Sequence, residues 1–169
     1  MNKLWAPWRS KYIYMRKRKS CIFCGRPHGS AGDKKKHIIC RAKHSFAMLN
    51  LYPYNNGHVM VAPCRHVKSL EQLSDVELLD VFRLLNRIKS LIDKKLKPHG
   101  YNIGINLGRV GGAGVAGHVH IHIVPRWAGD TNFMPITADT KVISESLAAM
   151  YKLLKVNPVR KDGLSNGVK

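Results

Sequence analysis

Residues 118–124 alternate between histidine and aliphatic side chains, in the order His-Val-His-Ile-His-Ile-Val. Alternation with period two predicts a β-strand, because successive side chains of a strand point to opposite faces. His118, His120 and His122 are therefore expected on one face, with the aliphatic residues between them directed to the core. Pro125 has no backbone N–H and is expected to end this strand.

Four other short apolar runs predict strands, at residues 37–41, 46–50, 58–62 and 101–107. The first three are rich in β-branched and apolar residues, and the fourth alternates between large apolar and small polar residues. The segment 52–57, Tyr-Pro-Tyr-Asn-Asn-Gly, predicts the turn between the second and third runs.

The clearest helix is predicted for residues 74–97, because Ser74 and Glu77 form the pattern of a capping box and Pro98 follows the far end. Eight apolar residues recur there at helical spacing and are expected to form one buried face. They are Val76, Leu79, Phe82, Leu84, Leu85, Ile88, Leu91 and Ile92. A second helix is expected around residues 141–155.

Runs of strands with helices between and after them favour an α+β fold with an antiparallel sheet. The 169 residues suffice for one domain of ordinary core size. We expect a basic, aromatic arm at 1–20, a folded domain at 21–156 and a polar tail at 157–169. The chain has no apolar segment of transmembrane length and no apolar signal at its start, so a cytoplasmic location is expected.

The chain is strongly basic, with 29 Lys and Arg against 10 Asp and Glu and a formal net charge of +19. Residues 1–45 hold 13 of these basic residues and one acid, Asp33. This distribution is consistent with a solvated basic arm, and equally with an arm that attracts a polyanion such as nucleic acid. Charge alone does not choose between the two.

A glycine-rich segment, residues 108–117, leads directly into the three histidines. It joins a strand to a strand, so it is neither a dinucleotide-binding turn nor a phosphate-binding loop of the kinds that open a helix. Its backbone N–H groups could nevertheless bind phosphate oxygens. The segment therefore predicts an anion site beside the histidines.

Three imidazoles on one face suit metal binding or phosphoryl chemistry. A neutral imidazole can attack phosphorus without an activating base, because its ordinary pKa of about 6.5 leaves it mostly unprotonated at pH 7. The second ring nitrogen must then donate a hydrogen bond, for which a flanking carbonyl suffices. Phosphoryl or nucleotidyl transfer fits this pattern better than acyl transfer.

Cys21 and Cys24 form a Cys-x-x-Cys pair, which in a reducing compartment indicates a metal or redox site before a disulfide. Tetrahedral zinc would need two more ligands, and nine histidines are available. Cys40 and Cys64 lie in apolar runs and are expected in the core.

These residues together resemble the histidine triad (HIT) family, whose motif His-φ-His-φ-His-φ-φ is matched at 118–124. Residues 50–61 resemble the ribose-binding strand and turn of that family. Residues 4–9, 106–109 and 124–133 resemble its branch of bacterial diadenosine tetraphosphate phosphorylases. The family resemblance implies a five-stranded antiparallel sheet with helices and a homodimer.

The resemblance also implies roles for individual residues. His120 would be the nucleophile that takes the adenylyl group from the α-phosphate, and His122 would contact the same phosphate. Asn50 would bind the ribose hydroxyls. The phosphate oxygens would be held by Asn106 and by the backbone of Gly112, Ala113, Gly114 and Val115.

In the metal-bearing bacterial members, zinc is held by a Cys-x-x-Cys pair and two histidines. In this chain the matching residues are Cys21, Cys24, His66 and His118, which makes His118 a structural ligand. Many members also place Ser or Thr shortly before the triad, whereas residues 111–117 here contain no hydroxyl.

The expected function is cleavage of dinucleoside polyphosphates through an adenylyl-histidine, with phosphorolysis of diadenosine tetraphosphate to ATP and ADP preferred. One alternative is a hydrolase of dinucleoside polyphosphates or adenosine phosphoramidates. Another is removal of adenylate from the 5′ end of nucleic acid, which would use the basic arm. A non-catalytic, zinc-containing nucleotide- or RNA-binding module is the third.

Overall fold

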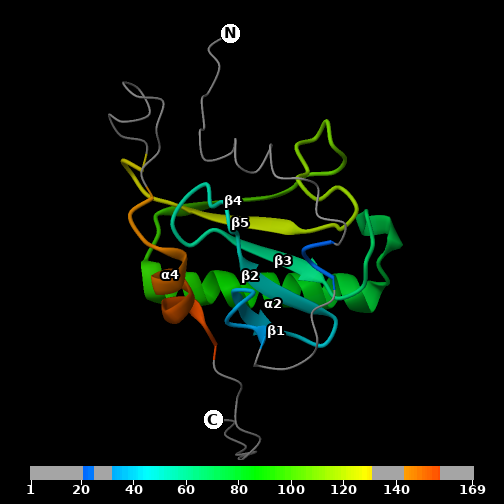
Figure 1. The fold of residues 1–169 in the computed structure, drawn as a ribbon, viewed down its shortest axis with the longest axis horizontal. Coiled ribbons are helices and arrows are strands. Elements are labelled where there is room, and N and C mark those ends of the chain that lie inside the picture. The colour runs from blue at the N-terminus through cyan, green and yellow to red at the C-terminus, as the bar shows by residue number, and fades with distance from the viewer. Residues whose placement is uncertain (1–20, 25–31, 131–142, 157–169) are drawn as a thin grey trace, which may run out of the picture.

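The computed structural model describes residues 21–24, 32–130 and 143–156. The basic arm and the polar tail expected from the sequence lie outside the described residues. The described residues form a five-stranded antiparallel sheet with two α-helices, which confirms the predicted α+β class (Figure 1).

All five predicted strands are present, and their ends differ by at most three residues from the sequence prediction. They are β1 (Ile38–Arg41), β2 (Ser45–Leu49), β3 (Val59–Pro63), β4 (Gly100–Ile105) and β5 (Ile121–Arg126). Their order in the sheet is β1-β2-β3-β5-β4, so the strand of the third triad histidine pairs on both sides. β1 and β4 form the two edges.

The prediction that Pro125 ends its strand is wrong, because β5 continues through it to Arg126. Pairing with β3 covers only Ile121 to Ile123, so beyond that point β5 has β4 as its sole partner in the sheet. A proline is tolerated where one side of a strand has no neighbour to receive its missing N–H. The ladder also starts later than predicted, since His118 and His120 precede Ile121.

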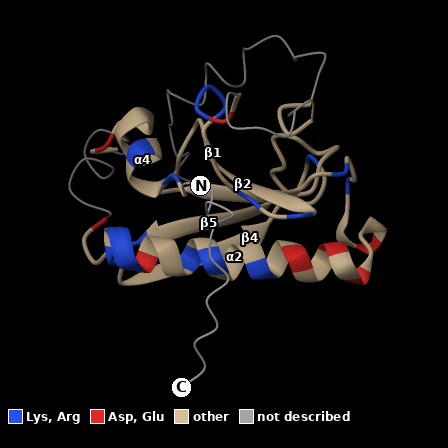
Figure 2. Ribbon diagram, turned by 90° about the horizontal axis from the view of Figure 1, so that it is seen from below, with Lys and Arg blue, Asp and Glu red and all other residues tan. Residues whose placement is uncertain are grey.

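Helix α2 (Asp75–Leu96) confirms the predicted start and end. The Ser74 side chain accepts from the backbone of Glu77 and the Glu77 carboxylate accepts from the backbone of Ser74, which is the complete capping box. Figure 2 shows acidic residues near the start of α2 and basic residues near its end, an arrangement that complements the helix dipole.

The buried face of α2 is narrower than predicted. Its buried residues are Val81, Leu84, Leu85, Ile88 and Ile92. Three of the apolar residues expected with them are largely exposed: Val76 at 62 %, Leu79 at 50 % and Phe82 at 47 %. At 100° per residue these three are turned roughly 100° or more from the centre of the buried face, so they do not meet the sheet.

Helix α4 (Leu147–Leu154) begins with Ser146 as its N-cap, so the predicted start near residue 141 is wrong. Cys40 is buried as expected, whereas Cys64 is exposed. No helix of the described residues combines the length and apolar character needed to cross a membrane.

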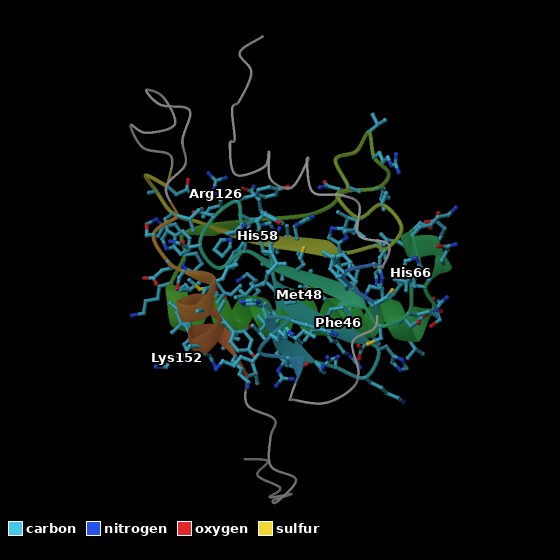
Figure 3. All side chains as sticks on the ribbon, viewed as in Figure 1. Phe46, Met48, His58, His66, Arg126 and Lys152 are labelled. Carbon is cyan, nitrogen blue, oxygen red and sulfur yellow. The ribbon has the colours of Figure 1, made fainter. Side chains whose placement is uncertain are left out.

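The two faces of the sheet carry separate clusters. One joins the sheet to α2 and α4 and includes Ile39, Val61, Ile88, Ile123 and Leu154. The opposite face carries Phe23, Ile38, Phe46, Met48, Met60 and Ala62. Figure 3 labels Phe46 and Met48 on β2, in the second of these clusters. The triad histidines lie on this second face.

Candidate active site

The three triad histidines differ in their surroundings although they alternate along one segment. His118 and His120 are buried, at 0 % and 4 % exposure, while His122 is half-buried. The residues between them, Val119 and Ile121, face the opposite core as predicted. The rings of His120 and His122 are 4.8 Å apart between centroids, so the last two imidazoles form one continuous surface.

The hydrogen bond of His120 determines which ring nitrogen is free. Its Nδ1 lies 2.8 Å from the carbonyl oxygen of His118, which can only accept, so Nδ1 carries the hydrogen. The Nε2 lone pair is therefore available. Burial lowers the pKa of His120, although this hydrogen bond acts in the opposite direction. The ring is thus a neutral imidazole with a defined nucleophilic atom.

His122 has the opposite tautomer to His120, with its hydrogen on Nε2. This tautomer is determined by His58, a residue that the sequence did not single out. The backbone N–H of Tyr54 donates to Nδ1 of His58 over 3.1 Å, so the hydrogen of a neutral His58 is on Nε2. This Nε2 lies 2.9 Å from Nδ1 of His122 and donates to it. The hydrogen of His122 is then on Nε2, where it can be donated to a ligand.

His58 and His122 are both held in the neutral form. Burial, with smaller contributions from the neighbouring histidines, lowers the pKa of His58 to about 3 and that of His122 to about 4. His58 is 1 % exposed. Met60 pairs directly with His122 in the sheet, so His58 is its diagonal neighbour on the same face. This position of His58 indicates its role only once the pairing of β3 with β5 is known.

The turn 52–57 packs against His58. The ring of Tyr54 lies 4.8 Å from that of His58 between centroids and covers it at an interplanar angle of 33°. Asn50 accepts the N–H of Tyr52 through Oδ1, and its Nδ2 is 3.4 Å from both ring nitrogens of His58. The predicted ribose ligand thus also supports the histidine pair.

A polar cluster attaches this turn to the end of β5. Asn55 donates to the carbonyl of Pro125 over 3.0 Å and to the carboxylate of Asp130 over 2.8 Å. Arg126 forms two hydrogen bonds to the same carboxylate, at 2.6 and 2.8 Å. Figure 3 shows Arg126 and His58 on the same side of the molecule. The cluster therefore fixes the position from which Tyr54 contacts His58.

Asn106 and the glycine-rich segment follow the end of β4, the strand that pairs with β5. Gly104 pairs with His122 in the sheet, and Asn106, two residues further on, continues this register toward His120. Asn106 Nδ2 is 3.4 Å from the carbonyl oxygen of Gly112. A Cβ on Gly111 would lie 2.3 Å from the carbonyl oxygen of Leu107, so this turn requires glycine there. Both parts of the predicted phosphate site are therefore adjacent.

The predicted backbone donors are not equivalent. The N–H of Gly112 donates to the carbonyl of Arg109, and that of Ala113 donates to the carbonyl of Gly108. Among the hydrogen bonds of the described residues, none uses the N–H of Gly114 or Val115. A phosphate oxygen could therefore accept from Gly114 and Val115 without breaking the hydrogen bonds that hold the turns of this loop.

The four predicted metal ligands come together at the other end of the triad. One ligand atom from each of Cys21, Cys24, His66 and His118 lies within 4.8 Å of every other. Cys24 Sγ is 3.0 Å from Nδ1 of His66 and 3.5 Å from Nδ1 of His118, and Cys21 Sγ is 3.6 Å from the latter. Figure 3 shows His66 far from His58, beyond the opposite end of β3.

Two of these three sulfur–nitrogen distances, 3.5 and 3.6 Å, fit a tetrahedral ion, and the third is shorter. With zinc–sulfur bonds of about 2.3 Å and zinc–nitrogen bonds of about 2.0–2.1 Å, neighbouring sulfur and nitrogen ligands are about 3.6 Å apart. His118 donates from Nε2 to the carbonyl of Pro63 over 2.9 Å, which leaves Nδ1 without a hydrogen and directed at the thiols. His118 is therefore committed to the cluster, and its role differs from that of His120.

Comparison with known proteins gives a consistent family assignment. The family model described as "HIT domain" matches residues 31–129. The chain is 37 % identical over 161 residues to a protein of Mycobacterium tuberculosis named AP-4-A phosphorylase, covering 91 % of this chain and 83 % of that relative. It is 40 % identical over 93 residues to the bis(5′-nucleosyl)-tetraphosphatase (asymmetrical) of Schizosaccharomyces pombe, covering 55 % and 50 %.

Solved structures share the fold. The NitFhit protein of Caenorhabditis elegans aligns with a TM-score of 0.57 and 32 % identity, over 70 % of this chain and 26 % of that chain. A zinc-bound histidine triad family protein of Mycobacterium smegmatis aligns with a TM-score of 0.58 and 24 % identity, over 70 % and 80 %. The five-stranded architecture is thus that of known structures.

Proposed function

The chain belongs to the HIT domain family, and from this we propose that it cleaves dinucleoside polyphosphates at the α-phosphate through an adenylyl-histidine at His120. Relatives named for dinucleoside polyphosphate substrates support this class of substrate. The observation that carries the proposal is the hydrogen bond from Nδ1 of His120 to the carbonyl of His118, which leaves Nε2 free in a neutral ring.

The first step is attack of the Nε2 lone pair on the α-phosphorus. The bond from phosphorus to the bridging oxygen breaks, and its electron pair leaves with the departing nucleotide, which is ATP when the substrate is diadenosine tetraphosphate. Because this phosphate is a weakly basic leaving group, a strong general acid is hardly needed. Inorganic phosphate then attacks the adenylyl-histidine, and His120 departs as ADP forms.

His122 and the loop would stabilise the charge on the transferring phosphorus. Nε2–H of His122, whose orientation follows from the donation by His58, is available to a phosphate oxygen. Asn106 and the N–H groups of Gly114 and Val115 would bind the remaining oxygens. Asn50 would bind the ribose. Donors already in place stabilise developing charge without reorganisation during the reaction.

Zinc is the ion that Cys21, Cys24, His66 and His118 would hold, since thiolates and imidazoles at tetrahedral spacing are its preferred ligands. Zinc bound by all four would stabilise the turn of residues 21–24, which we call the knuckle. Lewis-acid chemistry would require an open coordination position, and a tetrahedral ion with four protein ligands has none. The steps above therefore use the imidazoles, Asn106 and the backbone donors, and none of them passes through the metal.

Product analysis with diadenosine tetraphosphate, with and without inorganic phosphate, tests this proposal. Phosphate-dependent formation of ATP and ADP is expected. ATP and AMP in both reactions would indicate a hydrolase instead. The absence of turnover in both would overturn the proposed substrate, and 5′-adenylated nucleic acid would be the next substrate to test.

We also propose that the protein pairs with a second copy along β4. This strand is an edge of the sheet, and its residue Ile103 is 45 % exposed. Phe82 of α2 is also exposed, at 47 %. An exposed strand edge with apolar side chains favours pairing with another chain. Sedimentation analysis should show a dimer that Ile103→Asp converts to a monomer; a wild-type monomer would contradict the pairing.

A further inference from the structure

An aromatic side chain lies between the two cysteines of the knuckle. Phe23 is 1 % exposed, whereas Cys21, Ile22 and Cys24 around it are half-buried. It is part of the cluster on the triad face of the sheet, with Phe46, Met48 and Met60 among its members. The residue is therefore directed inward from the metal cluster and has no access to a bound substrate.

The Phe23 ring contacts both of the buried triad histidines. Its centroid is 4.7 Å from that of His120, with an interplanar angle of 35°, and 5.1 Å from that of His118, at 46°. Both distances lie within the range of favourable aromatic pairs, about 4.5–7 Å. One side chain thus connects a proposed metal ligand to the proposed nucleophile.

The contact restrains His120 in a way that its hydrogen bond does not. The bond from Nδ1 to the carbonyl of His118 fixes one edge of the ring, while rotation about that bond would still move Nε2. Phe23 contacts the ring at an interplanar angle of 35° and restricts this rotation. Two restraints, one on the edge and one on the face, define the direction of the Nε2 lone pair.

The position of Phe23 depends in turn on the cysteines. Cys24 donates its backbone N–H to the carbonyl of Cys21 over 3.2 Å, so residues 21–24 form a single tight turn. The two thiols at its ends face His66 and His118. An ion bound by these four side chains would fix both ends of the turn and hold Phe23 against His120.

We propose that Phe23 is a positioning residue that transmits the occupancy of the Cys21-Cys24-His66-His118 cluster to the orientation of His120. The proposal rests on the proposed role of His120 as nucleophile. A bound ion keeps Phe23 against the His120 ring, and loss of the ion releases that contact while the sheet stays folded. The knuckle then regulates the reactivity of the site.

Phe23→Leu, loaded with zinc, tests the positioning role, and Phe23→Met is prepared in parallel in case the first variant does not fold. Formation of the adenylyl-enzyme should slow by about tenfold to a hundredfold with KM unchanged, because misplacing a reacting group lowers the rate and Phe23 does not touch substrate. Met48→Ala is the matched control, since Met48 is 1 % exposed in the same cluster. It should lower the melting temperature without this loss of rate.

A substrate-free measurement distinguishes this proposal from the proposed function. The ring resonances of His120, assigned by comparison with His120→Asn, should change when zinc is removed by a chelator and return when zinc is added back. In Phe23→Leu with full zinc content they should already be shifted, and chelation should add little. This change is expected even if diadenosine tetraphosphate is not turned over.

The second route from metal to nucleophile runs through the backbone, because the carbonyl of His118 accepts from His120. If this route alone acts, chelation changes the His120 resonances equally in the wild type and in Phe23→Leu. That result, or a wild-type rate for the zinc-loaded variant, would overturn the proposal. If chelation unfolds the wild type, the zinc-loaded variants still decide, through the rate and the His120 resonances.

Discussion

The two ends of the triad share one face of the protein but offer opposite chemistry. At one end, His118 is completely buried, donates from Nε2 to Pro63 and directs Nδ1 at two thiols. At the other end, His122 is half-buried, accepts at Nδ1 and keeps an N–H for a ligand. Alternation along the chain places the three imidazoles together, and the partner of each ring then determines its role.

Removing the imidazole between the two ends should have the largest effect. His120→Asn is expected to abolish turnover, because His118 directs its ring-nitrogen lone pair at the thiols and that of His122 accepts from His58, which leaves the lone pair of His120 for the attack. The zinc content should remain that of the wild type. Steady-state rates and metal analysis check both expectations. Loss of zinc in this variant would instead place His120 among the ligands.

Disrupting the His118 end should lower stability, in addition to the effect on rate proposed through Phe23. Cys24→Ser removes one of the four cluster ligands, and structural zinc in small domains supplies roughly 10–16 kcal/mol of apparent binding free energy. We expect reduced zinc content and a melting temperature lower by about 10 °C or more. Thermal unfolding and metal analysis measure this, with Cys64→Ser as the control at an exposed cysteine. Equal stability of the two variants would contradict a metal-dependent knuckle.

Disrupting the His122 end should affect rate and leave the metal in place. His58→Leu removes the donor to Nδ1 of His122, so the hydrogen of His122 is no longer restricted to Nε2. We expect the rate to fall by up to about a hundredfold, the lower end of the effect of removing such a donor outright, because the His122 ring itself remains. His58→Gln, which retains a donor and an acceptor, should lose less. Unchanged NMR tautomer signals of His122 in His58→Leu would contradict this interpretation.

The smallest expected effect is that of pH on the reaction rate, and it again concerns the His122 end of the triad. Burial lowers the pKa of His122 to about 4, so lowering the pH from 8 to 6 leaves this ring neutral. The value of kcat/KM, which reports the free enzyme, should change by less than about twofold over that interval and fall at lower pH as the imidazoles gain protons. A midpoint at or above 6.5 would indicate an exposed, unperturbed histidine.

Local signals in the sequence predicted the local features well. The capping box at Ser74 and Glu77 gave the start of α2, since both partners are three residues apart. The buried face predicted for the same helix is too wide, because Val76 and Phe82 follow helical spacing but point away from the sheet. Periodicity alone does not say which side of a helix meets the core.

Features that depend on partners distant in the chain were harder to predict. The role of His58 follows from a contact with His122, 64 residues later, and a lone histidine before an apolar strand gives no local sign of it. Among nine histidines, His66 was assigned to the knuckle only through the family resemblance. The backbone donors of Gly112 and Ala113 were indistinguishable from their neighbours until the turns of the loop were known.

The order of strands has a consequence for how the protein forms. β5 lies between β3 and β4 in the sheet and pairs with both of them, whereas β3 and β4 do not pair with each other. While the chain is synthesised, β3 and β4 emerge with open edges, and neither can be completed until residue 126 has left the ribosome. The last strand of the sheet to be made thus completes the sheet, contains His122 and follows directly after His118 and His120. A chain stopped before residue 118 would expose the edges of β3 and β4 and would lack all three triad histidines.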